Sequence, residues 1–230
     1  MCYDIQTSLI TLVVNIVTSI ALFIMAGNAN QLKAIALFFL FVGFMQFWDA
    51  LFWSYDATTN VNVYATKMAM IWNHLEPVVL SLLIYLFMGK LTMPSLIVLA
   101  VYVMAITAYS VNGWGELRGT EATKETCGSL YWQWNIMKGY KLVYGLFVVC
   151  LLVLAQQHFT GWVRWLFIVL LMGTFFFSFY KYNVKASVGR FWCYFAAFCP
   201  IFFLIGTACW LPIYTFFFYK NVIFSGWFYG

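Results

Sequence analysis

Two carboxylates and one carboxamide lie inside long apolar stretches of the sequence. Asp49 lies near the end of one stretch, and Asn73 and Glu76 lie within the next one. An ionisable side chain in the hydrocarbon region costs about 2.5–3.5 kcal/mol near its centre, so it marks a functional site by default. Carboxylates and amides that line a narrow path bind or pass small ions. These residue types therefore point to ion or proton chemistry inside a membrane.

Helical geometry brings these three side chains to similar depths. At a rise of about 1.5 Å per residue, Asp49 lies roughly 9 Å inside a helix that ends near Tyr55. Asn73 lies at about that depth in a helix that begins near Thr66, and Glu76 lies one turn deeper. Because a short loop joins the two helices, we expect them to be antiparallel neighbours.

Other predicted helices add polar side chains to the same half of the membrane. Lys141 is expected to pair with Glu76 or Asp49, because a buried carboxylate needs a compensating charge. Asn15 and Asn73 are expected to supply hydrogen bonds to these groups. The candidate cavity residues are Asp49, Glu76, Asn73, Lys141, Asn15, Trp72, His74, Lys138 and Arg190.

The opposite half of the predicted bundle is almost purely apolar. The pattern therefore predicts a polar cavity that opens only towards the N-side, the face that holds residues 1–7, 56–65, 111–131 and 181–190. The alternative is that these groups only hold helices together, since amides bond across helices in lipid. For His74 we prefer this structural role, because helical geometry turns it about 160° away from Glu76.

Composition decides the class of protein. The chain has 230 residues, of which 65% are apolar and 8% are charged, whereas a soluble domain has about 25% charged residues. This composition excludes a soluble enzyme, a disordered regulator and a coiled coil. Its twelve Lys and Arg residues are scattered, which argues against nucleic-acid binding. The expected partners are the lipid bilayer and a small ion or molecule, and a homo-oligomer is left open.

Seven stretches are long enough to cross a bilayer as helices, which takes roughly 20 apolar residues each. They are continuously apolar rather than alternating, so the expected fold class is all-α, one domain over 1–230, and not a β-barrel. We expect the first span to be retained, since no basic segment precedes it. Residues 111–131 are expected to form a water-facing loop, and 213–230 an interfacial tail. The predicted spans are 8–26, 34–55, 66–88, 93–110, 132–155, 162–180 and 191–212.

Orientation and disulfide bonding stay open at this stage. Eight Lys and Arg residues on the N-side against four on the other face favour a cytoplasmic N-terminus. Without the three cations assigned to the cavity, the balance is five to four and decides nothing. Cys2 and Cys127 are the two cysteines that can meet in water, and a bridge between them needs an oxidising compartment.

Motifs for catalysis and metal binding are lacking in the sequence. His74 and His158 are the only histidines and are expected near opposite faces, so a three-histidine zinc site cannot form. The sequence has no serine-hydrolase, zinc-protease or nucleotide-binding motif. We therefore expect no enzyme, no cofactor and no metal. The favoured function is a channel or carrier for protons or another small ion or solute; a receptor or small-molecule-binding protein comes second, and an intramembrane enzyme third.

Short motifs along the chain resemble an uncharacterised family of small polytopic membrane proteins found in bacteria and large DNA viruses. The motifs are Met1-Cys2-Tyr3-Asp4, Gln46-x-x-Asp49 and Arg190-x-Trp192-Cys193-Tyr194. Members of that family often begin Met-Cys-Trp-Ser and carry a late Trp-Cys-Trp, so this chain differs in its third and fourth residues. The resemblance implies that Cys2 belongs with Trp192 and Cys193, and it implies no activity.

Overall fold

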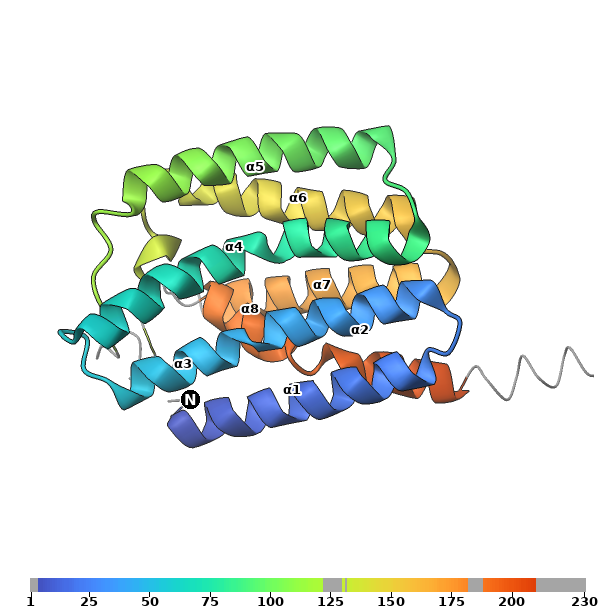
Figure 1. The fold of residues 1–230 in the computed structure, drawn as a ribbon, viewed down its shortest axis with the longest axis horizontal. Coiled ribbons are helices and arrows are strands. Elements are labelled where there is room, and N and C mark those ends of the chain that lie inside the picture. Colours follow the sequence, from blue (N-terminus) through green and yellow to red (C-terminus); the bar gives the residue numbers. More distant parts are fainter. Residues whose placement is uncertain (1–3, 122–129, 131, 182–187, 210–230) are drawn as a thin grey trace, which may run out of the picture.

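The computed structural model describes residues 4–121, 130, 132–181 and 188–209, and within them the chain is helical (Figure 1). A short 3₁₀ turn, Gln133–Asn135, precedes α6, and after α8 the helical backbone resumes over 199–209. The helices are α1 (Ile5–Met25), α2 (Asn30–Gly43), α3 (Met45–Ser54), α4 (Asn60–Met88), α5 (Met93–Gly113), α6 (Tyr140–His158), α7 (Gly161–Lys181) and α8 (Val188–Ala196).

The predicted number of membrane spans is confirmed. In the described part of the chain, seven helices are long and apolar enough to cross a membrane, with α2 and α3 forming one span, Asn30–Ser54. Two predicted span starts are wrong by six residues or more. The third span begins at Asn60 rather than 66, because Thr59 caps α4 by accepting from the backbone N–H of Asn62 at 3.2 Å. The fifth begins at Tyr140 rather than 132, directly after Gly139, whose φ of 95° suits only a glycine.

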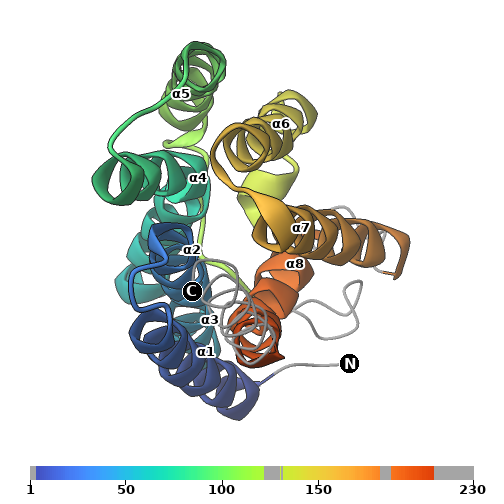
Figure 2. The same cartoon turned by 90° about the vertical axis from the view of Figure 1, so that its right-hand side faces the viewer.

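Seen end-on in Figure 2, α1 to α5 lie along one side of the bundle and α6 to α8 along the other. Contacts of α6 with α5 and α4, and of α8 with α2, join the two sides. The apolar core in the half away from the N-side is built on large buried side chains such as Phe38, Phe147 and Phe167. A second cluster of buried side chains lies towards the N-side and includes Met70, Trp132, Trp134 and Cys193.

Helix α1 is polar on its inner face and apolar on its outer face. Ser8, Thr11, Asn15 and Ser19 are buried, while a row that includes Val13 is exposed. Small and polar residues let helix backbones approach closely in lipid, where no hydrophobic effect drives helices together. The distribution is therefore that of a helix that faces lipid.

Asn15 lies where three helical segments meet. A Cβ at Gly43 would lie 2.1 Å from Asn15 Cγ, so α1 and α2 are in close contact there. On the other side, Asn15 Nδ2 donates to the carbonyl of Ala197 at 2.9 Å. That carbonyl lies at the break between α8 and 199–209, where the N–H of Ile201 bonds to Phe198 instead. Pro200 causes the break, because a proline inside a helix clashes with the preceding turn.

The connection after α5 folds onto the N-side end of the bundle. Asn62 Nδ2 donates to the carbonyl of Thr120 at 2.9 Å, and Asn62 Oδ1 accepts from the backbone N–H of Thr120 at 2.7 Å. Thr66 and Thr120 share a hydrogen bond of 2.9 Å between their hydroxyls. Leu117 and Thr120 are buried. The expectation that all of 111–131 faces water is therefore wrong, because Thr120 satisfies its backbone inside the bundle.

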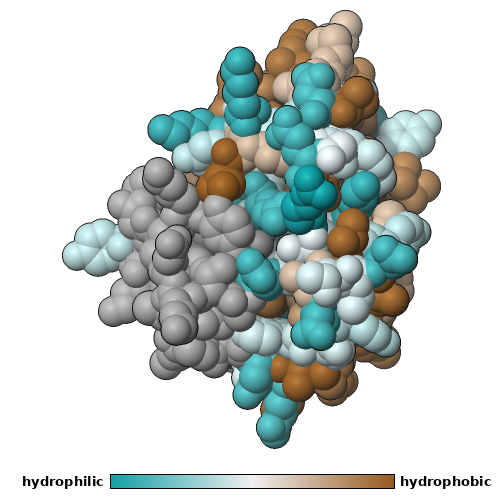
Figure 3. All heavy atoms as spheres, turned by 90° about the vertical axis from the view of Figure 1, so that its left-hand side faces the viewer, coloured by the Kyte–Doolittle hydropathy of each residue, from teal (hydrophilic) through white to brown (hydrophobic). Residues whose placement is uncertain are grey.

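Polar and charged side chains nonetheless cover much of this end of the molecule. Figure 3 faces the N-side, where hydrophilic side chains lie across the centre and apolar ones gather at the upper and lower edges. Among the residues of this end, Lys67 Nζ lies 5.1 Å from the ring centroid of Trp114. Cys2, Cys127 and the tail 213–230 lie outside the described residues, so the disulfide and the interfacial tail stay predictions.

Candidate functional site

Five side chains form a connected polar chain inside the bundle, here called the Glu76 chain. The Sγ atom of Cys193 on α8 lies 3.4 Å from Asn73 Oδ1 and 3.9 Å from Glu76 Oε1. Asn73 and Glu76 both belong to α4. Asn73 Nδ2 donates to the hydroxyl of Tyr144 on α6 at 3.1 Å. The Tyr144 hydroxyl donates to Asn135 Oδ1 in the 3₁₀ turn. The chain thus runs from a carboxyl group on α4 to the segment that leads in from the N-side loop.

Four of the five members of the Glu76 chain are buried, and Tyr144 is half-buried. Asn73 is 0% exposed and Glu76 and Cys193 are each 1% exposed. Polar groups without water must find partners in the protein. Asn73 Oδ1 accepts a hydrogen bond from the Cys193 thiol, and Asn73 Nδ2 donates one to the Tyr144 hydroxyl. The carboxamide is therefore the link between α8 and α6.

Asp49 lies under an indole cover on the N-side. Its Oδ1 accepts from Trp132 Nε1 at 3.2 Å, and the ring of Trp132 stacks on that of Trp134 at a centroid distance of 4.9 Å. Asp49 is 1% exposed, and both tryptophans are fully buried. The cavity that was expected to open towards the N-side is therefore closed over Asp49 by the segment that precedes α6.

Two candidate cations are not part of the site. Lys138 and Lys141 are exposed, and Lys141 Nζ lies 6.0 Å from the ring centroid of the neighbouring Tyr140. The expected burial of Lys141 beside Glu76 or Asp49 is wrong, because α6 begins only at Tyr140 and its first turn faces outwards. The backbone of Arg190 lies in the first turn of α8, and its side chain lies outside the described structure.

Three further candidates, Asn15, Trp72 and His74, are buried or half-buried and form their hydrogen bonds outside the Glu76 chain. Asn15 bonds to Ala197, away from the Glu76 chain. Trp72 stacks on Phe41 at a centroid distance of 4.3 Å, and its Nε1 donates to the Phe41 carbonyl at 2.9 Å. This contact joins α4 to α2 and leaves the indole no donor for a cavity.

His74 lies on another face of α4, as its helical angle predicts. Its Nδ1 lies 2.7 Å from the Met70 carbonyl. Because a carbonyl only accepts, Nδ1 carries the proton and Nε2 is the acceptor. The ring centroid lies 5.5 Å from that of Tyr144, so His74 packs beside the Glu76 chain without belonging to it. Pro77 lies one turn later in α4 and has no backbone N–H to donate within the helix. In the preceding turn, the carbonyl of His74 accepts a hydrogen bond from the Tyr102 hydroxyl at 2.7 Å.

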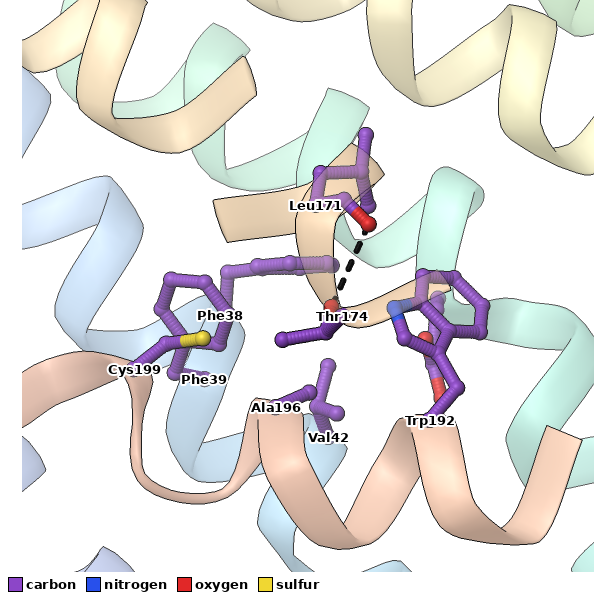
Figure 4. A pocket seen from close by; sticks show the side chains of 9 residues that line it. Phe38, Phe39, Val42, Leu171, Thr174, Trp192, Ala196 and Cys199 are labelled. Atoms are coloured by element: carbon purple, nitrogen blue, oxygen red, sulfur yellow. Dashed lines mark hydrogen bonds between the residues drawn. The ribbon is translucent and has the colours of Figure 1, made fainter. Parts of the chain in front are cut away.

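A narrow pocket borders Glu76 and is lined by residues of α2, α4, α7, α8 and the helical segment after α8. Its volume is about 250 Å³, which includes space open to the outside, and on the order of one water-sized sphere fits within it. Figure 4 shows Thr174 at its centre, with Trp192 on one side and Phe38, Phe39 and Cys199 on the other. Apart from Glu76, Trp192, Thr174 and Cys199, its walls are apolar.

The donor set does not fit a metal centre. Among the residues that the structure describes, no group of three or more His, Cys, Asp or Glu side chains converges. His158 lies at the other end of the bundle, where its Nε2 is 3.0 Å from the Ser95 hydroxyl. The two histidines are thus separated as the sequence predicts.

Sequence reasoning missed several members of the site. The sequence does not single out Tyr144 and Trp132, because aromatic residues are common in membrane proteins, and it does not single out Asn135. A cysteine inside a membrane span commonly serves as a small apolar side chain, and for Cys193 the family resemblance alone points to a further role, together with Trp192. The available signal was the spacing of Tyr144, which follows Asn135 closely enough for the two to meet across one helix start.

No known protein family matches the chain, and neither a curated protein nor a solved structure matches it. The class of protein therefore rests on the fold. It is a multi-pass integral membrane protein, with seven membrane-spanning helices in the described part of the chain. The resemblance to the family of small polytopic proteins stays a prediction.

Proposed function

We propose that the protein is a membrane channel or carrier for protons or another small cation, with the Glu76 chain as part of its path. The observation that carries the proposal is the unbroken series of contacts from Glu76 through Cys193, Asn73 and Tyr144 to Asn135. A carboxyl, a thiol and a hydroxyl can each both donate and accept a hydrogen bond. Such groups pass a proton by exchanging the donor and acceptor roles. The carboxamides of Asn73 and Asn135 keep fixed donor and acceptor atoms, so their part is to hold the Cys193 thiol and the Tyr144 hydroxyl in position.

The surroundings of Glu76 favour a change of charge at this residue. Intramembrane carboxyl groups recur in proton relays because they are costly to keep without a function. The nearby Lys138 and Lys141 are exposed and so do not neutralise Glu76. A buried carboxylate that takes up a proton no longer carries the cost of a desolvated charge. The proposal involves no catalysed reaction and no cofactor.

Purified protein in liposomes tests the proposal. With a proton gradient, we expect a flux that Glu76→Gln lowers at least about tenfold, since a positioned proton-transfer group contributes at least that much. Glu116→Gln is the matched control, because Glu116 is an exposed acid on the N-side and lies outside the Glu76 chain. Unchanged flux in Glu76→Gln contradicts the role of the chain. If neither protons, alkali cations nor anions cross under any gradient, the transport proposal fails, and small-molecule binding becomes the leading alternative.

A further inference from the structure

The pocket beside Glu76 also holds an indole N–H that has no partner in the described residues. Trp192 is 3% exposed, and its Nε1 is buried without a hydrogen bond. In Figure 4 the indole nitrogen of Trp192 points into the pocket, towards Thr174. A buried donor that makes no hydrogen bond costs about 1–3 kcal/mol, so each one calls for an explanation.

The polar groups around this pocket are complementary to one small molecule that both donates and accepts. The Thr174 hydroxyl already donates its proton to the carbonyls of Leu170 at 2.6 Å and Leu171 at 3.2 Å. Its oxygen can therefore only accept a hydrogen bond from a molecule in the pocket. Glu76 offers carboxyl oxygens and Trp192 offers a proton. One donor and two acceptors match a water molecule, which needs two to four polar partners.

We propose that one water molecule occupies this pocket and bridges Trp192 Nε1 to the carboxyl group of Glu76. The volume accommodates about one such molecule. A metal cation does not suit the pocket, because an N–H points into it and hard cations take six or more oxygen ligands. The water extends the Glu76 chain by one step beyond Glu76. If the proposed function holds, the transported species is then a proton rather than a metal ion.

Water-edited solid-state NMR of the protein in lipid bilayers tests the site directly. With ¹⁵N-labelled tryptophan, Trp192→Phe assigns the indole signal by its disappearance. We expect that signal to receive magnetisation from water quickly, and to lose this transfer in Glu76→Leu. Trp72 is the matched control, since its Nε1 bonds to a backbone carbonyl at 2.9 Å. A Trp192 signal that builds up as slowly as that of Trp72 overturns the proposal.

Proton flux in liposomes of the same variants separates this inference from the function on which its transport role rests. Trp192→Phe keeps an aromatic ring in the wall of the pocket and removes only the donor, and we expect it to lower proton flux about tenfold. Water contact at Trp192 without any proton flux in the wild type supports the water site and overturns the proposed function. Proton flux without water contact supports the function and overturns the site. If water contacts Trp192 but proton flux is unchanged in Trp192→Phe, the water site is real and its role in the proton path is wrong.

Discussion

The thiol of Cys193 carries one proton and faces two oxygen acceptors. Its Sγ lies 3.4 Å from Asn73 Oδ1 and 3.9 Å from Glu76 Oε1. Because a thiol donates to one acceptor at a time, the hydrogen bond can pass between the carboxamide and the carboxyl group.

Replacing this thiol separates its hydrogen bonding from its volume. Cys193→Ala removes the donor, and we expect proton flux in liposomes to fall about tenfold. Cys193→Ser keeps a donor of similar size and should retain most of the flux. Cys150→Ala is the control, because that buried thiol packs in the apolar core and not in the Glu76 chain. Equal fluxes in the alanine and serine variants would exclude a hydrogen-bonding role for residue 193.

Residue spacing predicted which side chains of α4 turn inwards, and it failed for the cations. Asn73 and Glu76 lie on successive turns of one helix, so the period of 3.6 places both on one face. Lys141 was placed by counting from a helix start at 132, eight residues too early. Hydropathy reports burial and not helicity, and Trp132 and Trp134 are fully buried without being part of α6. The start of α6 depends on the backbone of Gly139, which hydropathy does not detect.

At the scale of helices, the contact between α1 and α2 depends on Gly43 of α2, which faces the carboxamide of Asn15 on α1. Gly43 leaves room for Asn15, whose Cγ would lie 2.1 Å from an added Cβ. Asn15 in turn bonds to the carbonyl left free at the break before Pro200. The first, second and last spans are therefore fixed relative to each other at one point.

A double-mutant cycle tests this three-helix contact. Gly43→Ala forces Asn15 to move, and we expect a loss of about 1–3 kcal/mol in the free energy of unfolding. In the background of Asn15→Ala the same change should cost less, since the opposing side chain is gone. Gly145→Ala is the control, because nothing lies within 4 Å of its Cβ position. Thermal or chemical unfolding in detergent gives the four values, and strictly additive losses would show that Gly43 and Asn15 do not oppose each other.

At the scale of the described molecule, Asp49 and the first turns of α4 are covered on the N-side. Trp132 shields Asp49, and Thr120 is bonded to the start of α4. The N-side segments therefore close the bundle in this conformation. Access to Asp49 from water requires the segment that carries Trp132 to move away from α3.

Cysteine accessibility in a background without native thiols measures this closure. We expect Lys141→Cys to react quickly with a small hydrophilic reagent added on the N-side, because Lys141 is exposed. Asp49→Cys should react slowly, and faster when combined with Trp132→Ala. Leu151→Cys is the negative control, since Leu151 is buried in the apolar core. Fast labelling of Asp49→Cys without Trp132→Ala would contradict the shielding of Asp49 by Trp132. Labelling of Lys141→Cys only from the opposite face would show that residue 141 does not lie on the N-side.

Helix α4 is longer than the hydrocarbon layer is thick, so with Met88 at the opposite surface its first turns extend beyond that layer. Its 29 residues span about 44 Å, against a hydrocarbon thickness of about 30 Å. Counting back about 30 Å from Met88 reaches the neighbourhood of Lys67. There the ammonium group lies 5.1 Å from the ring centroid of Trp114, and both residue types favour the headgroup level.

From that level, Glu76 lies about 14 Å down the helix, close to the middle of the hydrocarbon layer. A charge that moves between the N-side surface and Glu76 therefore crosses about half of the transmembrane potential. Since a full crossing is worth about 2.3 kcal/mol per 100 mV, the half crossing is worth about 1.2 kcal/mol. If the proposed proton transport holds, the flux therefore depends on the membrane potential.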